Sequence, residues 1–313
     1  MKKLLALALS LTLALALLAG CGSTSQETAE TETEETAEAS EPAETAGLEP
    51  DPETAILVVS FGTSYNESRD ATIGATEAAI QAAFPEFEVR RAFTSQIIID
   101  KLAERDGLEI DNVTQALDRA AADGIKNLVV QPTHLMDGYE YNDLKDELAN
   151  YGDVFDQIIL GEPLLSSDED VEAVISVITS DTASYDDGQT AIVFMGHGTE
   201  AGSNAVYAKV QEMLTADGFE NYYIGTVEAT PSLDDVIAAL ADKDYTRVVL
   251  EPLMVVAGDH ANNDMAGDED DSWKTILTGE GYEVECILEG LGQKPGIQAI
   301  YVDHVRAAVD QLA

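Results

Sequence analysis

The folded part of this 313-residue chain is predicted to be an α/β protein with two similar, doubly wound parallel-sheet domains and a cleft between them. Two observations predict this class. Short apolar runs alternate with helical stretches, and the second half of the chain repeats motifs of the first. Such alternation is typical of parallel sheets with helices on both faces, and open sheets of this kind bind ligands at the carboxyl ends of their strands.

The strands are predicted from β-branched and apolar runs. They are expected at Ala55–Phe61, Phe87–Ala92, Asn127–Gln131, Phe155–Leu160, Ala191–Met195, Tyr222–Val227, Arg247–Glu251 and Tyr282–Ile287. Helices are expected between them at Glu67–Ala83, Asn112–Ala122, Asp168–Ile178, Ala201–Leu214 and Leu233–Ala241, with others around Trp273 and near Gly296–Leu312. A joint near residues 180–190 gives an N-terminal domain at 55–185 and a C-terminal domain at 186–313, and the last helix is free to pack back.

The repeated motifs indicate an internal duplication. Residues 55–63 read AILVVSFGT, and residues 191–199 read AIVFMGHGT. The segment VVQP at 129–132, followed by Gly138 and Asn142, matches VLEP at 249–252, followed by Gly258 and Asn262.

The first twenty residues have the pattern of a secretory signal. Two lysines precede an apolar run over Leu4–Leu18, and the segment LAG leads to Cys21. The run is too short to span a bilayer comfortably, so cleavage before Cys21 and lipidation of its thiol are predicted. The protein is then expected to be exported and anchored to the outer face of a membrane. An uncleaved membrane helix is the alternative.

Residues 21–54 are predicted to be a disordered acidic tether that starts at the lipidated Cys21. From residue 22 onward the tether has eleven carboxylates, no lysine or arginine, and almost no large apolar side chain. Such a segment cannot bury a core, and its like charges extend it.

The whole chain is strongly acidic, with 60 Asp and Glu against 16 Lys and Arg and a formal net charge of −44. This charge argues against nucleic acid as a partner, and it attracts cations. Once Cys21 is lipidated, Cys286 is the single remaining cysteine, so no intramolecular disulfide is expected.

Comparison of the two halves separates scaffold positions from site positions. Phe61, Phe93 and Glu140 in the first half are matched to His197, Glu228 and His260 in the second. The second half alone has a His, Glu, His set, and each member falls at or just after the end of a predicted strand. Two imidazoles and a carboxylate suit Co²⁺, Fe²⁺, Ni²⁺ or Zn²⁺ better than Mg²⁺. His197 in a glycine-bounded turn and His260 in a polar loop also have purely structural interpretations.

These residues lie in motifs that resemble the anaerobic sirohydrochlorin cobalt chelatases. The motifs are GHGT at 196–199, VEATP at 227–231, EPLMVVAGDHANNDMAG at 251–267, SFGTS at 60–64, RAFTS at 91–95 and QPTH at 131–134. The resemblance runs from about residue 55 to the C-terminus. It implies the class II chelatase fold, with two α/β domains around a tetrapyrrole cleft, and metal binding by His197, Glu228 and His260.

The implied reaction is insertion of Co²⁺, itself a substrate, into a sirohydrochlorin-type tetrapyrrole without an organic cofactor. His197 is the leading candidate for metal ligand and proton acceptor, and Glu228 and His260 are co-ligands. Phe61, Gly62, Thr63, Arg91, His134 and Glu140 are assigned to substrate binding. For Arg91, pairing with a local carboxylate is an equal alternative, as is a structural role for His134.

Two other functions stay open at this point. A cell-surface lipoprotein could bind haem, another tetrapyrrole or a metal ion without turnover, and the export signal favours that interpretation. A chelatase for nickel or iron keeps the mechanism and changes the ion, because the ligand types do not separate these metals. The sequence leaves the oligomeric state open.

Overall fold

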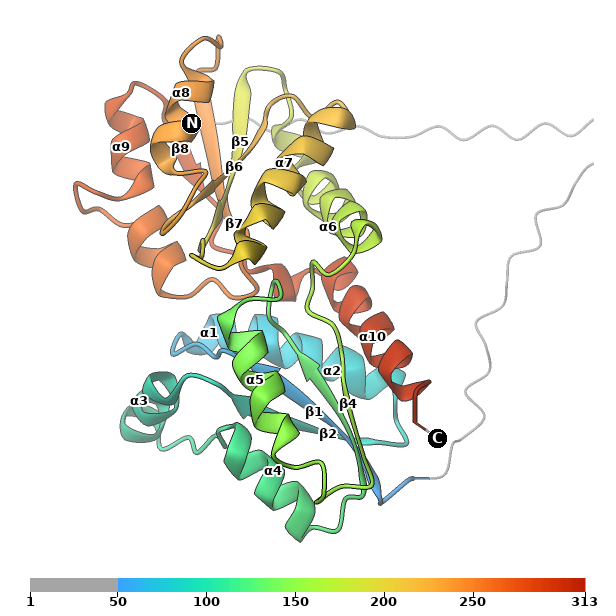
Figure 1. The fold of residues 1–313 in the computed structure, drawn as a ribbon. Helices are drawn as coiled ribbons and strands as arrows, with labels where there is room; N and C mark the ends of the chain where they lie inside the picture. Colours follow the sequence, from blue (N-terminus) through green and yellow to red (C-terminus); the bar gives the residue numbers. More distant parts are fainter. Residues whose placement is uncertain (1–49, 313) are drawn as a thin grey trace, which may run out of the picture. The chain divides into compact units, whose positions relative to one another are not determined.

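Two four-stranded parallel sheets organise residues 50–312, the part of the chain that the computed structural model describes (Figure 1). The first sheet has the order β2-β1-β3-β4, with β1 (Thr54–Ser60), β2 (Glu88–Phe93), β3 (Asn127–Pro132) and β4 (Gln157–Leu160). The second has the order β6-β5-β7-β8, with β5 (Thr190–Gly196), β6 (Tyr222–Thr226), β7 (Arg247–Pro252) and β8 (Glu283–Cys286). The predicted α/β fold, its eight strands and the repeat of one topology in both halves are confirmed.

The helices of the first half follow its strands. They are α1 (Asn66–Arg69), α2 (Ala75–Ala83), α3 (Gln96–Asp106), α4 (Val113–Ala122), α5 (Tyr139–Ala149) and α6 (Asp168–Asp181). A π-helical turn over Asp70–Gly74 interrupts the single helix predicted at 67–83. Helices α3 and α5 were not predicted, because α3 opens with three β-branched isoleucines and no side chain caps the start of α5.

The second half contains α7 (Ala205–Ala216), α8 (Leu233–Leu240), α9 (Trp273–Gly279) and α10 (Pro295–Val309), all close to predicted positions. A π-helical turn over Ala261–Met265 follows β7. Reciprocal capping boxes fix where α4, α6 and α8 begin, since each pairs a side chain before the helix with one in its first turn. The pairs are Asn112 with Gln115, Ser167 with Asp170, and Ser232 with Asp235.

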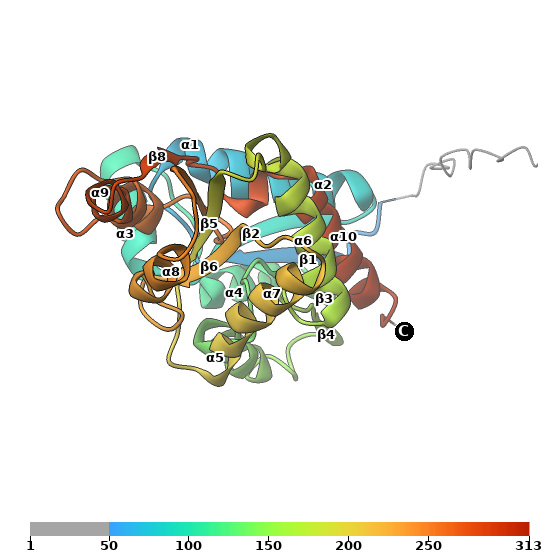
Figure 2. The same ribbon diagram turned by 90° about the horizontal axis from the view of Figure 1, so that it is seen from above.

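The two halves exchange helices. The apolar face of α6, which precedes residue 185, packs with β5 and α7 in the core of the second sheet. Helix α10 ends the chain, and Val305 and Ala308 near its end pack against β1 and α2 of the first sheet. Figures 1 and 2 show α10 beside α6 and α2. The predicted boundary near 180–190 therefore separates the two sequence repeats, but each hydrophobic core includes a helix from the other side of that boundary.

Polar contacts fix α10 in this position. The Tyr301 hydroxyl donates to the Thr133 carbonyl at 2.9 Å, and His304 Nε2 lies 3.0 Å from Asp170 on α6. At the start of α10, the Lys294 ammonium contacts the fully buried Glu251 of β7 at 2.7 Å and also bonds Asp181 of α6. Burial raises the pKa of Glu251 to about 7, against the effect of Lys294. This ion pair links three elements from both halves.

The folded part begins slightly before its predicted start. The Asp51 amide donates to the Glu86 carbonyl at 3.0 Å, Glu53 pairs with Lys126, and β1 starts at Thr54, so the end of the predicted tether joins the fold. The predicted signal, Cys21 and most of the tether lie outside the described residues. Within residues 50–312, no helix combines the length and apolar character needed to cross a membrane.

Candidate metal centre

Three side chains of the predicted metal site lie together at the carboxyl edge of the second sheet. His197 follows β5, Glu228 follows β6, and His260 follows β7, so the order β6-β5-β7 makes the three loops neighbours. One ligand atom from each residue lies within 4.8 Å of the other two. The two imidazole rings are 4.6 Å apart between centroids and nearly perpendicular. The structure thus brings together residues that are far apart in the sequence.

The loops that carry His197 and Glu228 approach each other closely because of Gly198. Its φ of +87° suits glycine, and a Cβ there would lie 2.8 Å from the Cβ and the backbone nitrogen of Ala229. The Glu228 amide donates to the His197 carbonyl at 2.9 Å, which ties the two loops directly. The tight turn therefore sets the spacing between an imidazole and a carboxylate.

Hydrogen bonds orient both imidazoles. Nδ1 of His197 lies 2.8 Å from the Gly198 carbonyl oxygen, and Nδ1 of His260 lies 2.8 Å from Oδ2 of Asp264. A carbonyl or carboxylate oxygen can only accept, so Nδ1 carries the proton in each ring. The Nε2 lone pair of each neutral ring is then available to a metal ion. The contact from Asp264 was not predicted, although its spacing of four residues from His260 was a visible signal.

The three candidate ligands are accessible to solvent. Side-chain exposure is 47% for His197, 57% for Glu228 and 32% for His260. Three protein ligands at an open site leave coordination positions free for water or substrate, as in catalytic rather than structural metal centres. Two imidazoles and one carboxylate fit Co²⁺ and its first-row neighbours.

Strand register corrects one of the predicted matches between the halves. Ser60 pairs with Phe93 in the first sheet, and Gly196 pairs with Thr226 in the second, so Phe93 corresponds to Thr226. The counterpart of Glu228 is Ser95, whose amide donates to the Phe61 carbonyl as that of Glu228 does to His197. The match of Glu140 to His260 holds, because Asn142 and Asn262 each bond the glycine four residues earlier.

A cavity of about 520 Å³ lies over this centre, between the strand ends of the two halves. Five of the residues assigned to substrate binding line it, namely Phe61, Gly62, Thr63, His134 and Glu140. Phe61 is 50% exposed, and Tyr139 of the same wall is 58% exposed. Met254, Val255 and Val256 add further apolar surface that was not predicted. The cavity therefore offers apolar surface to a flat molecule beside the candidate metal ligands.

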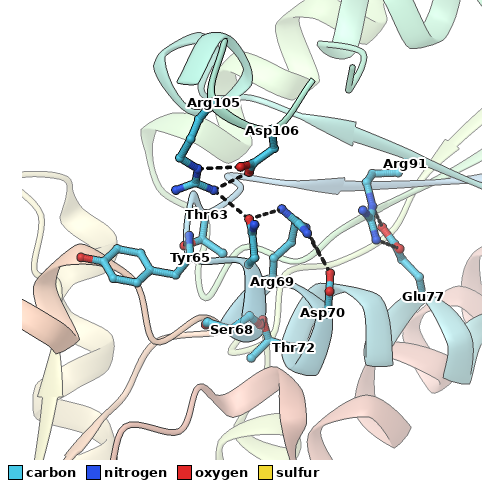
Figure 3. A network of polar contacts seen from close by, with 11 residues as sticks. Thr63, Tyr65, Ser68, Arg69, Asp70, Thr72, Glu77, Arg91, Arg105 and Asp106 are labelled. Atoms are coloured by element: carbon cyan, nitrogen blue, oxygen red, sulfur yellow. Dashed lines mark hydrogen bonds and ion pairs between the residues drawn. The ribbon is translucent and has the colours of Figure 1, made fainter. Parts of the chain in front are cut away.

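The structure does not bring Arg91 to this cavity. Its Nε donates to Glu77 of α2 at 2.7 Å, and a second bond joins the same two side chains. Figure 3 shows this pair apart from the other polar contacts of the first half. The assignment of Arg91 to substrate binding is thus corrected to the local pairing alternative, because Arg91 does not line the cavity and a bidentate carboxylate holds its guanidinium beside α2.

His134 lies in the cavity wall, but neither ring nitrogen has a hydrogen-bond partner among the described residues. Burial lowers the pKa of His134 to about 4, although the Glu140 carboxylate acts in the opposite direction. The ring is therefore neutral near pH 7. It provides surface to the cavity rather than charge.

Comparison with known proteins gives the family. The model of the cobalt chelatase (CbiK) family matches residues 54–310. The chain belongs to the cobalt chelatase family. Two curated relatives are similar to this family member over 82% of its length. A sirohydrochlorin cobaltochelatase of Salmonella typhimurium is 41% identical, and the match covers 96% of that protein. The sirohydrochlorin cobaltochelatase CbiKC of Nitratidesulfovibrio vulgaris is 31% identical, and the match covers 91% of it.

Solved structures confirm the fold of this cobalt chelatase family member. SirB from Bacillus subtilis with Fe³⁺ aligns with a TM-score of 0.57 at 14% identity, covering 82% of this chain and 95% of that one. The sirohydrochlorin chelatase SirB from Bacillus subtilis subspecies spizizenii, in complex with cobalt, aligns with a TM-score of 0.54 at 12% identity, covering 82% and 96%. The predicted class II chelatase arrangement is confirmed.

Proposed function

We propose that this protein inserts Co²⁺ into a sirohydrochlorin-type tetrapyrrole and that His197, Glu228 and His260 hold the incoming ion. The convergence of these three side chains in a cavity that also has apolar lining residues carries the proposal. The names of the two curated relatives support the substrate, and the cobalt complex of a structural neighbour supports the metal. The reaction needs no organic cofactor.

In the proposed chemistry, the metal ion moves from the three protein side chains to the pyrrole nitrogens of the macrocycle. The ion loses water as it binds Nε2 of His197, Nε2 of His260 and the Glu228 carboxylate, which offsets part of its charge. On insertion, two pyrrole N–H bonds break, the nitrogen electron pairs bond to the metal, and two protons leave. The Nε2 of His197 is free once the ion moves, so it accepts one proton. The exposed Glu228 passes the other to solvent.

A visible-spectrum assay tests this function. Purified protein is mixed with metal-free sirohydrochlorin and Co²⁺, and the conversion of the metal-free bands to those of the cobalt complex is followed against a protein-free control. Faster conversion with protein supports the proposal. A rate equal to the control, with the macrocycle nevertheless bound, would favour the non-catalytic binding protein. Parallel runs with Ni²⁺ and Fe²⁺ rank the metals, since ligand type alone does not.

We further propose that the mature protein is exported and held at a membrane surface by lipid on Cys21. The apolar run over residues 4–18 and the LAGC segment support this, and the family match begins only at residue 54. Metabolic labelling with a fatty acid tests it in the producing bacterium. Label on the natural protein, and none on Cys21→Ala, is expected. Equal labelling of both would contradict the anchor.

A further inference from the structure

The metal cavity has the wrong charge for the rim of the substrate that we propose. Its lining includes Glu140, Glu200, Glu228 and Asp259, and no lysine or arginine from residues 50–312. A sirohydrochlorin-type macrocycle carries acetate and propionate groups around its edge, which are anionic near pH 7. Carboxylates placed against this lining would meet like charges in a partly dehydrated space. The rim carboxylates are therefore more stable outside this lining, in water or beside cations.

A second cavity of about 770 Å³ adjoins the first and offers such cations. The two cavities share Ser64 and Tyr65 in their linings, and the second also contains Lys101 and Arg105 of α3. The Tyr65 hydroxyl donates to Asp259 Oδ1 at 3.3 Å, one residue before the ligand His260. The second cavity thus begins beside the metal centre and leads away from it between the halves.

Lys101 is free to bind an anion. Most lysines and arginines in the described part of the chain pair with a carboxylate, but Lys101, Lys145 and Lys243 do not. Of these three, Lys101 alone lines either of the two cavities. An exposed ammonium without a partner keeps its three donors available.

Arg105 is held in position with donors to spare. Its Nε and Nη2 both donate to the Asp106 carboxylate, at 2.9 and 2.5 Å, and Nη2 also donates to the Asn66 side-chain oxygen at 2.8 Å. The same Asn66 oxygen accepts from Arg69 at 2.8 Å, and Arg69 pairs with Asp70, so the contacts form the chain in Figure 3. Nη1 of Arg105 bonds no described residue. The Nη1 donors of this fixed guanidinium can therefore bind a further carboxylate without displacing Asp106.

We propose that the second cavity is a carboxylate subsite, in which Lys101 and Arg105 bind acid groups of a macrocycle whose ring lies over the metal centre. This inference rests on the proposed function. Glu67 and Glu289 also line the cavity, so its two cationic and two acidic side chains balance. Recognition then depends on short-range hydrogen bonds from Lys101 and Arg105 rather than on a long-range field. The subsite anchors one edge of the ring and so orients its nitrogens toward the metal ligands.

The test measures binding of metal-free sirohydrochlorin by fluorescence titration, which requires no turnover. Lys101→Ala should weaken binding about threefold, in the range of exposed ion pairs, and Lys101→Glu about tenfold. Arg105→Gln should match or exceed the alanine effect, and the double variant should exceed each single one. Lys243→Ala is the matched control, an unpaired lysine in neither cavity, and should bind as wild type.

Two further measurements separate the possible causes of weaker macrocycle binding. Calorimetric Co²⁺ affinity should be the same in all these variants, because none touches the metal ligands, and thermal midpoints report any folding defect. Wild-type affinity in Lys101→Glu and in the double variant would overturn the subsite, whether or not the protein inserts metal. Absence of insertion by the wild type, with macrocycle binding still weakened by the variants, would instead overturn the proposed function and leave the subsite standing.

Discussion

Asp264 gives a sharp prediction about the proposed metal centre, because it contacts the proposed ligand His260 and is not itself one of the three proposed ligands. Its Oδ2 accepts from Nδ1 of His260 at 2.8 Å, which leaves Nε2 as the nitrogen that would bind the proposed ion. Loss of such a partner typically costs 10- to 100-fold in metal affinity. The side chains of His260 and Asp264 are 32% and 45% exposed, so water replaces part of the lost bond. Asp264→Ala should therefore weaken Co²⁺ binding about tenfold, or about 1.4 kcal/mol.

Calorimetric titration with Co²⁺ measures this effect. Asp264→Asn keeps an oxygen acceptor and loses the charge, so it should fall between wild type and Asp264→Ala. Asp268→Ala removes a nearby exposed carboxylate that pairs with Lys274 and should change little. Wild-type affinity in Asp264→Ala would refute the orienting role. An equal loss in the Asp268 variant would show that overall charge, rather than His260 orientation, sets the affinity.

Three further predictions concern stability and the loops. The pKa of His134 is lowered to about 4, against about 6.5 in the unfolded chain, so the unfolded state binds a proton that the folded state does not. Stability on the order of 3 kcal/mol should therefore be lost as the pH falls from about 6.5 to about 4. His134→Phe should flatten this pH dependence in urea titrations. Lys294→Met leaves the buried Glu251 unpaired and should lower the free energy of unfolding by about 3 kcal/mol at pH 8. The loss should be smaller at pH 5, where the Glu251 carboxyl is protonated. Adding Glu251→Gln should restore stability, and no restoration would disprove the pairing. Gly198→Ala should lower the free energy of unfolding by about 1 to 3 kcal/mol and weaken Co²⁺ binding. Gly62 is its counterpart in the first half and also has a positive φ, so Gly62→Ala should strain the backbone in the same way but leave Co²⁺ affinity intact.

The strands were predictable because their signal is local. Continuous apolar runs such as 55–59 and 191–195 are buried from both faces of a parallel sheet, and turns bound them. The exchange of α6 and α10 was not predictable in full, since both helices have ordinary amphipathic sequences. Only the packing of Val171 and Ile175 with the second sheet, and of Val305 with the first, decides which core each helix completes.

The candidate site, too, could be predicted from the sequence only in part. His197 and His260 were found because the duplication marks positions where the halves differ, and strand ends share an edge in a parallel sheet. Glu228 was identified but matched to the wrong counterpart, because β2 and β6 share no motif and only the hydrogen-bonded register identifies Ser95. The partner of Arg91 was undecidable from sequence, because Glu77 is one of many acids and only the packing of α2 beside β2 selects it.

Single-turnover insertion tests the central claim most directly, namely that His197, Glu228 and His260 deliver the ion. Protein preloaded with one equivalent of Co²⁺ is mixed with metal-free sirohydrochlorin, and the conversion rate is compared with that of the three alanine variants under the same conditions. His304→Ala, a histidine that joins α10 to α6, is the control and should insert metal as wild type. The account predicts that each ligand variant loses most of the wild-type rate together with tight Co²⁺ binding. Insertion at the wild-type rate by His197→Ala would contradict it.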